Sequence, residues 1–309
     1  MTDPRGVIIR AQSGFFVVAT DHGEVKARLR GKLKQGPKTG DLVAIGDEVT
    51  VSSQPDGRHM IESIADRRSK LSRMAPSARG EYEQIIVANL DQAVFVFACA
   101  DPVPRMRMLD RFLVIAEVQE IPAVIVANKV DLVGERAAAE LFGHYPILGY
   151  PVIYTSAEDQ QGIHELRKQL VGKLSVFAGP SGVGKSSLLN HVLPQANLEV
   201  REVSETTGKG MHTTVFRQLL PLAEGGFVAD TPGLKALALW DIEPEELDGY
   251  FPELAARVPD CQFSNCSHID EPGCAVLAAL EAHEINPMRY ESYVRLRFQD
   301  EDLPKGFSE

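Results

Sequence analysis

The sequence predicts an α/β protein built from three parts, and three stretches of the chain lead to this prediction. Short strand-like segments separated by turn residues fill residues 1–70, and apolar strand-like runs alternate with helix-like segments over residues 82–240. Residues 241–309 contain a cluster of cysteine and histidine. Alternating strands and helices are typical of a parallel sheet covered by helices. We therefore expect a small barrel, a central α/β domain and a helical domain that binds a metal.

The composition fits a protein of this kind. The 309 residues are 44% apolar and 24% charged, which supplies sizeable cores and an ordinary share of charge. The sequence shows no secretory signal pattern and no apolar stretch long enough to span a bilayer. Its four cysteines make a disulfide scaffold a poor explanation. We therefore expect a cytoplasmic protein without a membrane partner, and we expect it to be a monomer.

The net charge of −11 is distributed unevenly along the chain. Residues 1–70 carry a balance of +3, residues 71–240 a balance of −3, and residues 241–309 a balance of −11. Nucleic-acid phosphates are attracted to basic surfaces. If the protein binds RNA, we expect the N-terminal part to make the first contact.

Five short strand-like segments in the N-terminal part favour a small barrel of the OB-fold type. They are Val7–Ile9, Phe15–Thr20, Val25–Leu29, Glu48–Val51 and Met60–Ile64. Lys26, Arg28 and Arg30 alternate with other residues and would share one face of a strand. This basic strip suits RNA phosphates, and it suits equally well a solvated strand edge that resists aggregation.

Strand-like and helix-like segments alternate after a polar stretch, Ser69–Glu83, which contains proline and glycine and which we interpret as a linker. A helix is predicted over Met106–Gln119, because its apolar residues fall on one side. The predicted strands around it are Ile85–Ala88, Ala93–Ala98, Ala123–Ala127 and Val152–Tyr154. This order predicts a parallel sheet.

A phosphate-binding loop lies at the centre of the α/β part. Residues 179–186 read Gly-Pro-Ser-Gly-Val-Gly-Lys-Ser, which matches G-x-x-x-x-G-K-[ST]. The loop follows an apolar run, Leu174–Ala178, and precedes a helix-like segment, Ser187–Leu193. Its backbone N–H groups would hold phosphates. Lys185 would reach the β- and γ-phosphates, and the Ser186 hydroxyl would hold Mg²⁺.

Two motifs at the ends of predicted strands resemble the base-binding motifs of GTPases. Residues 128–131 read Asn-Lys-Val-Asp, the N-K-x-D pattern that reads guanine, and residues 155–157 read Thr-Ser-Ala, which contains the S-A pair that backs the base. The Asp131 carboxylate could accept hydrogen bonds from N1–H and N2–H of guanine, a pair of donors that adenine lacks. The Lys129 stem could cover the base. The second motif also fits an ordinary helix cap.

Two loops downstream of the phosphate-binding loop look like the switch loops of GTPases. Residues 208–214 read Gly-Lys-Gly-Met-His-Thr-Thr, and Thr213 would complete the Mg²⁺ shell together with Ser186. Residues 230–233 read Asp-Thr-Pro-Gly, which resembles the D-x-x-G motif. Asp230 would hold Mg²⁺ through water, and the Gly233 N–H would sense the γ-phosphate.

The C-terminal part contains a candidate zinc site. Cys261, Cys266, His268 and Cys274 follow the spacing C-x₄-C-x-H-x₅-C, and three of the four cysteines of the chain are among them. Three thiolates and one imidazole make a closed tetrahedral set for one structural Zn²⁺. The alternative is a coincidental cluster of reduced thiols. The flanking segments, Pro244–Leu254 and Pro287–Phe298, read as helices.

The order of these motifs carries a resemblance to a known family. Ordinary GTPases run phosphate-binding loop, switch loop, D-x-x-G, N-K-x-D and S-A, whereas here the last two come first. With its barrel and zinc domain, the chain resembles the circularly permuted GTPases of small ribosomal subunit biogenesis. The resemblance implies an Mg²⁺-dependent enzyme for GTP and GDP that binds the small subunit and its rRNA late in maturation and is stimulated by it. The nucleotide-binding residues are then Asn128, Lys129, Asp131, Ser156, Ala157, Gly179, Pro180, Ser181, Gly182, Val183, Gly184, Lys185, Ser186, Ser187, Thr214, Asp230 and Gly233.

The sequence departs from Ras-like enzymes at one catalytic position. Leu234 follows the D-x-x-G motif, where a Ras-like enzyme has a glutamine that orients the attacking water. Leucine cannot orient water, so we expect slow intrinsic hydrolysis and an external stimulus. His212 could approach the water instead, beside Lys185 and Thr213 as the other predicted catalytic residues. A solvated loop histidine is the alternative.

Two other functional classes stay open on the sequence. One is a kinase or ATPase that uses ATP, which the guanine-reading Asp131 disfavours and which nucleotide competition would decide. The other is an RNA-binding structural protein with a vestigial nucleotide site. The presence of Lys185, Ser186 and Asp230 disfavours it, and measurable turnover would decide.

Overall fold

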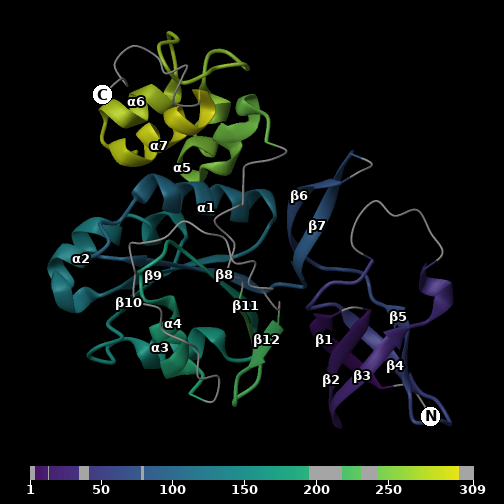
Figure 1. Ribbon diagram of the computed structural model, residues 1–309. Coiled ribbons are helices and arrows are strands. Elements are labelled where there is room, and N and C mark those ends of the chain that lie inside the picture. The colour runs from purple at the N-terminus through teal and green to yellow at the C-terminus, as the bar shows by residue number, and fades with distance from the viewer. Residues whose placement is uncertain are drawn as a thin grey trace.

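The computed structural model describes residues 4–12, 14–34, 42–77, 80–194, 218–230 and 242–298, without the side chains of residues 34, 73–82 and 230. Figure 1 shows three bodies, which are a β-barrel, a central sheet covered by helices on both faces, and a helical domain above the central sheet. In the ranges that the structure describes, no helix is long and apolar enough to cross a membrane.

The N-terminal barrel closes as the sequence predicts. Its strands are β1 (Arg5–Gln12), β2 (Phe15–Thr20), β3 (Gly23–Leu29), β4 (Glu48–Ser53) and β5 (His59–Ile64). They pair in the order β1, β2, β3, β5, β4, and β4 returns to β1. All of these pairs are antiparallel except β3 with β5. The alternating inward residues Ile8, Val18, Val51 and Ile61 fill the interior.

A β-hairpin occupies the segment that the sequence predicted to be a linker, so that prediction is wrong. Strand β6 (Lys70–Ser77) pairs antiparallel with β7 (Gly80–Ala88). The apolar pattern of this segment is weak, and Pro76 and Gly80 are residues typical of turns and linkers, so the sequence did not reveal these strands. The ends of the hairpin nevertheless join the protein core, where Leu71 and Val87 are buried. The predicted boundaries of the three parts stay predictions.

The central sheet has the order β10, β9, β8, β11, β13, β12, and its first five strands run parallel. Their bounds are β8 (Gln92–Ala98), β9 (Ala123–Asn128), β10 (Val152–Thr155), β11 (Leu174–Ala178), β12 (Gln218–Pro221) and β13 (Phe227–Asp230). Strand β12 is antiparallel to β13 and also pairs with β1 through Gln218 and Arg10. The sheet therefore continues into the barrel.

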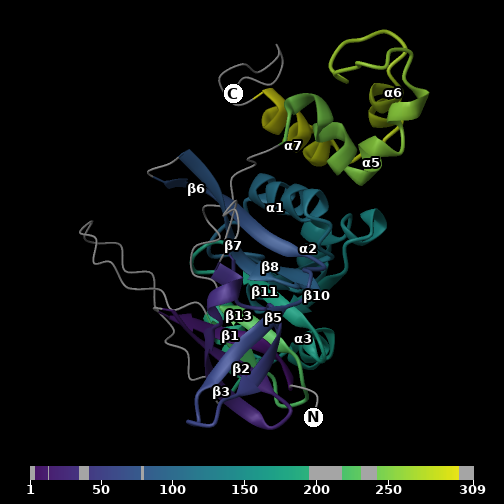
Figure 2. The same ribbon diagram turned by 90° about the vertical axis from the view of Figure 1, so that its right-hand side faces the viewer.

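Helices cover both faces of the central sheet (Figures 1 and 2). On one face lie α1 (Met106–Val118) and α2 (Glu135–Phe142), and on the other lie α3 (Ile163–Leu170) and α4 (Lys185–Val192). The side chains of strand β8 alternate between the two layers. Phe95 and Phe97 lie 5.4 and 6.1 Å from the Phe112 ring of α1, while Val94 and Val96 join the core beneath α3 and α4.

The order of the parallel strands creates a switch point. The chain runs from β8 outward to β9 and β10, and then crosses back so that β11 lies on the opposite side of β8. In open α/β sheets, ligands bind at the carboxyl ends of strands where the order reverses. The phosphate-binding loop follows β11, and residues 128–131 begin at the end of β9.

The C-terminal domain consists of short helices. These are η5 (Pro244–Tyr250), α5 (Pro252–Ala255), η6 (Val258–Asp260), α6 (Ala275–Glu281) and α7 (Pro287–Phe298). The single helix predicted over Pro244–Leu254 is wrong, because the structure divides it into a 3₁₀ segment and a short α-helix. Phe251 has an extended backbone there, which is the conformation that the following proline favours.

A buried cluster of charges joins this domain to the central domain. Arg289 of α7 bonds Asp110 of α1 at 2.7 Å, and both side chains are 1% exposed. The guanidinium also bonds Glu253 at 2.7 Å and lies 4.6 Å from the centre of the Phe251 ring. Burial alone would lower the pKa of Arg289, but the two carboxylates outweigh burial and raise it. The arginine therefore stays charged.

Asp110 has further partners that complete this joint. Tyr145 donates a hydrogen bond to one carboxylate oxygen at 2.8 Å, and Ser292 donates to the other at 2.5 Å. Burial and the Asp110 charge raise the pKa of Tyr145, so its hydroxyl stays protonated and remains a hydrogen-bond donor. A buried ion pair is tolerated only when its remaining lone pairs are satisfied in this way.

We expect Arg289→Ala to loosen the C-terminal domain, because it leaves two buried carboxylates without their cation. Removal of one partner from a buried pair costs about 3–5 kcal/mol. Hydrogen exchange over residues 287–298 would measure the loss as a lower opening free energy. The matched control is Arg257→Ala, which breaks an exposed pair with Glu284 in the same domain and should cost less than about 1 kcal/mol. Equal effects of the two substitutions would contradict the structural role of Arg289.

Candidate nucleotide site and metal centre

The phosphate-binding loop lies between β11 and α4, as the sequence predicts. Gly179 and Gly184 are needed because their φ angles are +151° and +92°. A Cβ at Gly179 would lie 2.0 Å from the Val96 carbonyl oxygen, and a Cβ at Gly184 would lie 2.3 Å from the Asn128 amide nitrogen. The Lys185 ammonium donates to the carbonyls of Gly179 and Pro180 at 2.9 and 2.5 Å. The lysine therefore lies along its own loop.

Asn128 connects the end of β9 to the phosphate-binding loop. Its side-chain nitrogen donates to the Val183 carbonyl at 2.8 Å, and its side-chain oxygen accepts from the Thr155 hydroxyl at 3.0 Å. Asn128 is 1% exposed, and Thr155 is fully buried. The structure thus brings together the loop and the two base-binding motifs. The sequence did not assign a role to Thr155, although it lies directly before Ser156.

Lys129 and Asp131 follow Asn128 on a tight turn. Lys129 has a left-handed backbone with φ of +63°, and its ammonium donates to the Asp101 carbonyl. Asp131 lies in the 3₁₀ turn Val130–Leu132 and is exposed. Burial raises the pKa of Cys99 to about 11, with a contribution from the Asp131 charge. The carboxylate is therefore near the end of β8 and open to solvent, where it can meet a base.

Ser156 and Ala157 begin the loop after β10. Ser156 is fully buried, and its hydroxyl accepts a hydrogen bond from the Asp159 N–H at 3.0 Å. Its own N–H donates to the Gln161 carbonyl at 3.1 Å. The loop is thus fixed beside the end of β9, because β9 and β10 pair as far as Asn128 and Thr155.

The predicted switch residues lie outside the described part of the chain. This holds for His212, Thr213, Thr214 and Gly233, and for Leu234. Asp230 ends strand β13, but its side chain is not described. Strand β13 pairs with β11, and Asp230 lies opposite Phe177. Its backbone is thus one strand away from the start of the phosphate-binding loop.

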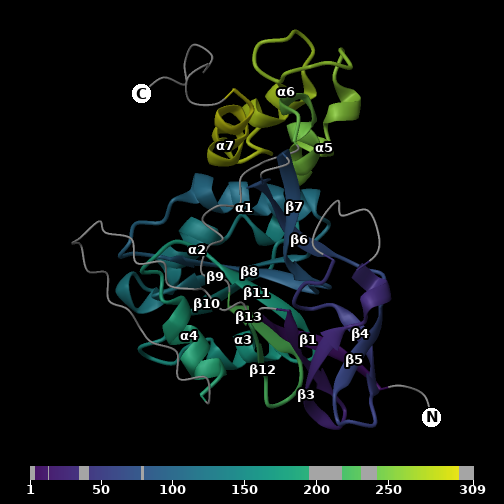
Figure 3. The ribbon, with the colours of Figure 1, turned by 45° about the vertical axis from the view of Figure 1, so that its right-hand side comes forward.

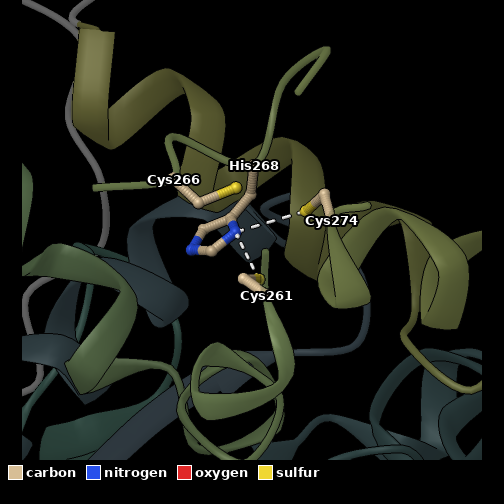
Figure 4. Close-up of side chains that lie close together, drawn as sticks. All are labelled: Cys261, Cys266, His268 and Cys274. Atoms are coloured by element: carbon tan, nitrogen blue, oxygen red, sulfur yellow. Dashed lines mark hydrogen bonds between the residues drawn. The ribbon is translucent and has the colours of Figure 1, made fainter. Parts of the chain in front are cut away.

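The four predicted zinc ligands converge in the C-terminal domain (Figure 4). The donor atoms of Cys261, Cys266, His268 and Cys274 all lie within 4.8 Å of one another. His268 Nδ1 lies 3.7 Å from the Cys261 sulfur and 3.4 Å from the Cys274 sulfur. Zn–S bonds of about 2.3 Å and Zn–N bonds of about 2.0 Å give tetrahedron edges of about 3.5 Å to 3.8 Å. The donor set therefore fits a structural zinc ion.

Asp248 orients the histidine of this cluster. Its carboxylate lies 3.0 Å from His268 Nε2, so the proton belongs on Nε2 and the Nδ1 lone pair faces the thiols. Burial would raise the pKa of Asp248, but the bond to His268 outweighs burial and lowers it. The sequence did not identify Asp248, which lies 20 residues before the histidine.

Glu271 shapes the loop that carries the ligands. It accepts hydrogen bonds from the Ser267 N–H at 2.6 Å and from the Ile269 N–H at 3.0 Å. Burial would raise the pKa of Glu271, but a hydrogen bond from the Ser267 hydroxyl, together with these two N–H donors, lowers it to about 2. Burial raises the pKa of Cys266 to about 12 and also raises that of Cys274. A cation among the thiols would reverse this preference for the protonated form.

The predicted basic strip of the barrel is divided. Lys26 Nζ and the Arg28 guanidinium lie 4.5 and 4.2 Å from the centre of the Phe15 ring. Arg30 instead bonds Glu62 at 2.7 Å. Two cations around an aromatic ring on adjacent strands remain as a basic surface, while the third is neutralised by its partner.

Comparisons with known proteins agree with this architecture. The family model for the RsgA GTPase matches residues 64–240, and the model for the RsgA N-terminal domain matches residues 5–61. The chain is 46% identical to a protein of Gemmatimonas aurantiaca named small ribosomal subunit biogenesis GTPase RsgA, over 96% of this chain and 97% of the relative. A protein of Alkaliphilus metalliredigens with the same name is 40% identical, over 94% and 96% of the two chains.

Solved structures show the same fold. The crystal structure of YjeQ from Thermotoga maritima superposes with a TM-score of 0.79 at 38% identity and covers 96% of this chain and 98% of that one. YloQ, described as a circularly permuted GTPase, superposes with a TM-score of 0.76 at 31% identity over 97% and 96%. The permuted domain, the barrel and the Cys₃His cluster expected from the sequence are thus confirmed. The chain belongs to the RsgA GTPase family of circularly permuted enzymes that hydrolyse GTP.

Proposed function

We propose that this GTPase binds the small ribosomal subunit and its rRNA in the cytoplasm and acts late in the maturation of that subunit. The observation that carries the proposal is the 46% identity, along almost the whole chain, with a relative named for small ribosomal subunit biogenesis. The basic pair at Lys26 and Arg28 beside Phe15 supports contact with RNA. Cations attract phosphates, and an aromatic ring can stack on an unpaired base.

We propose that GTP binds across the carboxyl ends of β11, β9 and β10. Residues 179–187 would hold the phosphates, and Asn128 supports this role because it fixes the loop to β9. Asp131 would read guanine, while Lys129, Ser156 and Ala157 would enclose the base. Ser186, Thr213 and Asp230 would hold Mg²⁺, which supplies positive charge at the transferred phosphate. Thr214 and Gly233 would complete the site.

We propose that the subunit stimulates hydrolysis. Leu234 has no group that can orient water, so another residue must orient the attacking water. His212 in the predicted switch loop is our candidate. Lys185 and Thr213 are the other proposed catalytic residues. We also propose that the protein is a monomer.

The direct test is phosphate release with and without purified small subunits. We expect the subunits to raise turnover at least about tenfold, because an externally completed GTPase site gains transition-state stabilisation. His212→Ala should remove most of this stimulation and leave GTP affinity nearly unchanged. If the subunits do not raise the turnover of the wild-type chain, the proposed function is contradicted. If they stimulate the variant fully, only the catalytic role of His212 is excluded.

We expect Asp131→Asn to weaken GTP binding by at least about tenfold, because two hydrogen bonds to the charged carboxylate are lost. The amide can pair with the C2 carbonyl of xanthine, so preference should shift toward xanthine nucleotides. Competition binding with both nucleotides measures the shift. Asp260→Asn, an exposed change in the C-terminal domain, is the control. Unchanged base selectivity would place Asp131 outside the base site.

We expect the purified protein to contain one zinc per chain and Asp248→Ala to bind it about 10- to 100-fold more weakly, because the His268 ring loses its orienting partner. Competition with a chelator measures the affinity. Asp260→Ala is the control, since this carboxylate is exposed in the same domain. An affinity that survives loss of Asp248 would mean that zinc binding does not depend on the bond from Asp248 to His268.

A further inference from the structure

A groove runs between α1 of the central domain and α7 of the C-terminal domain. It has a volume of about 740 Å³, within the range of ligand-binding clefts. Figure 3 shows α7 lying above α1, so the groove crosses the joint between two domains. The buried bond from Arg289 to Asp110 and the bond from Ser292 to Asp110 hold the two helices together beside it.

The charged side chains of the groove are mostly cationic. Arg105, Arg107 and Arg111 line it from the start of α1, and Arg295 lines it from α7. Among the described lining residues, Glu291 is the single acid, and it bonds Arg295 at 2.7 Å. The groove is therefore basic at the edge of a C-terminal segment whose charge balance is −11.

The position of the arginines is unfavourable for α1 itself. Arg105 is the N-cap residue and makes no capping hydrogen bond from its side chain, and the first turn contains Arg107 but no acid. The positive end of the helix dipole lies there, so cations destabilise this end and an anion would stabilise it. A sequence that breaks a local preference in this way is typical of a functional surface.

We propose that this groove binds the phosphate backbone of ribosomal RNA. The inference rests on the proposed function, which supplies the RNA. Guanidinium groups hold phosphate oxygens through paired hydrogen bonds, and the apolar Met288, which is 55% exposed, can contact sugars. The rest of the C-terminal domain is acidic and would repel RNA. The arginine-lined groove is therefore the surface along which RNA could contact this domain. An RNA strand held there would contact both domains at once.

The test compares the Arg105→Ala/Arg107→Ala variant with the wild-type chain, both with zinc, for binding to purified small subunits at several salt concentrations. A non-hydrolysable GTP analogue is present throughout. We expect at least about tenfold weaker binding at 0.1 M salt, and a salt slope reduced by about one for each arginine that contacts a phosphate. The control pair is Arg136→Ala/Lys168→Ala, which removes the same charge from exposed positions on α2 and α3.

Zinc content and unfolding temperature check that each variant is folded. If the wild-type chain binds subunits and the groove variant binds with the same affinity and slope, the groove proposal is overturned while the proposed function stands. If the wild-type chain does not bind subunits, both fall. A photoreactive residue in place of Met288 identifies the partner chemically. An adduct with rRNA supports the proposal, whereas an adduct with ribosomal protein only, or none, refutes it.

Discussion

The Asn128 side chain donates to the Val183 carbonyl and accepts from the Thr155 hydroxyl, and the arrangement of three loops at the edge of the central sheet depends on this pair of bonds. They fix the phosphate-binding loop, the end of β9 and the end of β10 relative to one another. Because the amide is buried, each lost bond would leave an unpaired polar group. Gly184 is part of the same constraint, since any side chain there would displace the Asn128 amide. The loop and the base-binding motifs therefore form one rigid unit.

This unit explains why the permuted order of the chain is tolerated. The motifs meet through the sheet, in which β8 lies between β9 and β11, and the pairing does not depend on which strand comes first in sequence. A sheet of parallel strands joined by surface connections can be opened at one connection and closed at another. In this chain the barrel leads into the sheet through the β6–β7 hairpin, and the C-terminal domain follows the strand that ends at Asp230.

Two kinds of interaction stabilise the C-terminal domain, one inside the domain and one at its contact with the central domain. The Cys₃His cluster and Asp248 organise its loops, because the domain has a small apolar core around Leu254, Val276 and Tyr293. The bond from Arg289 to Asp110 then attaches the domain to α1. Because both charges are buried, they are stable only in an arrangement that keeps them paired. The attachment lies on the helix that follows β8. The phosphate-binding loop and the domain that carries the Cys₃His cluster are thus both attached to the central α/β domain.

Local chemistry allowed the sequence to predict the strand–loop–helix setting of residues 179–186, the position of residues 128–131 at a strand end, the Cys₃His cluster and most strands. The residues of each of these features are close in sequence or lie at the ends of adjacent strands, so residue type and spacing suffice to predict them. The β6–β7 hairpin was missed because its apolar pattern is weak, and the strand predicted at Ile85–Ala88 belongs to this antiparallel hairpin and not to the parallel sheet. Asp110 and Arg289 could not be paired in advance, since 179 residues separate them. The basic groove and the role of Asp248 likewise depend on helices that meet only after folding. Tertiary packing alone decided these features, because no local pattern specifies which distant side chains share a buried space.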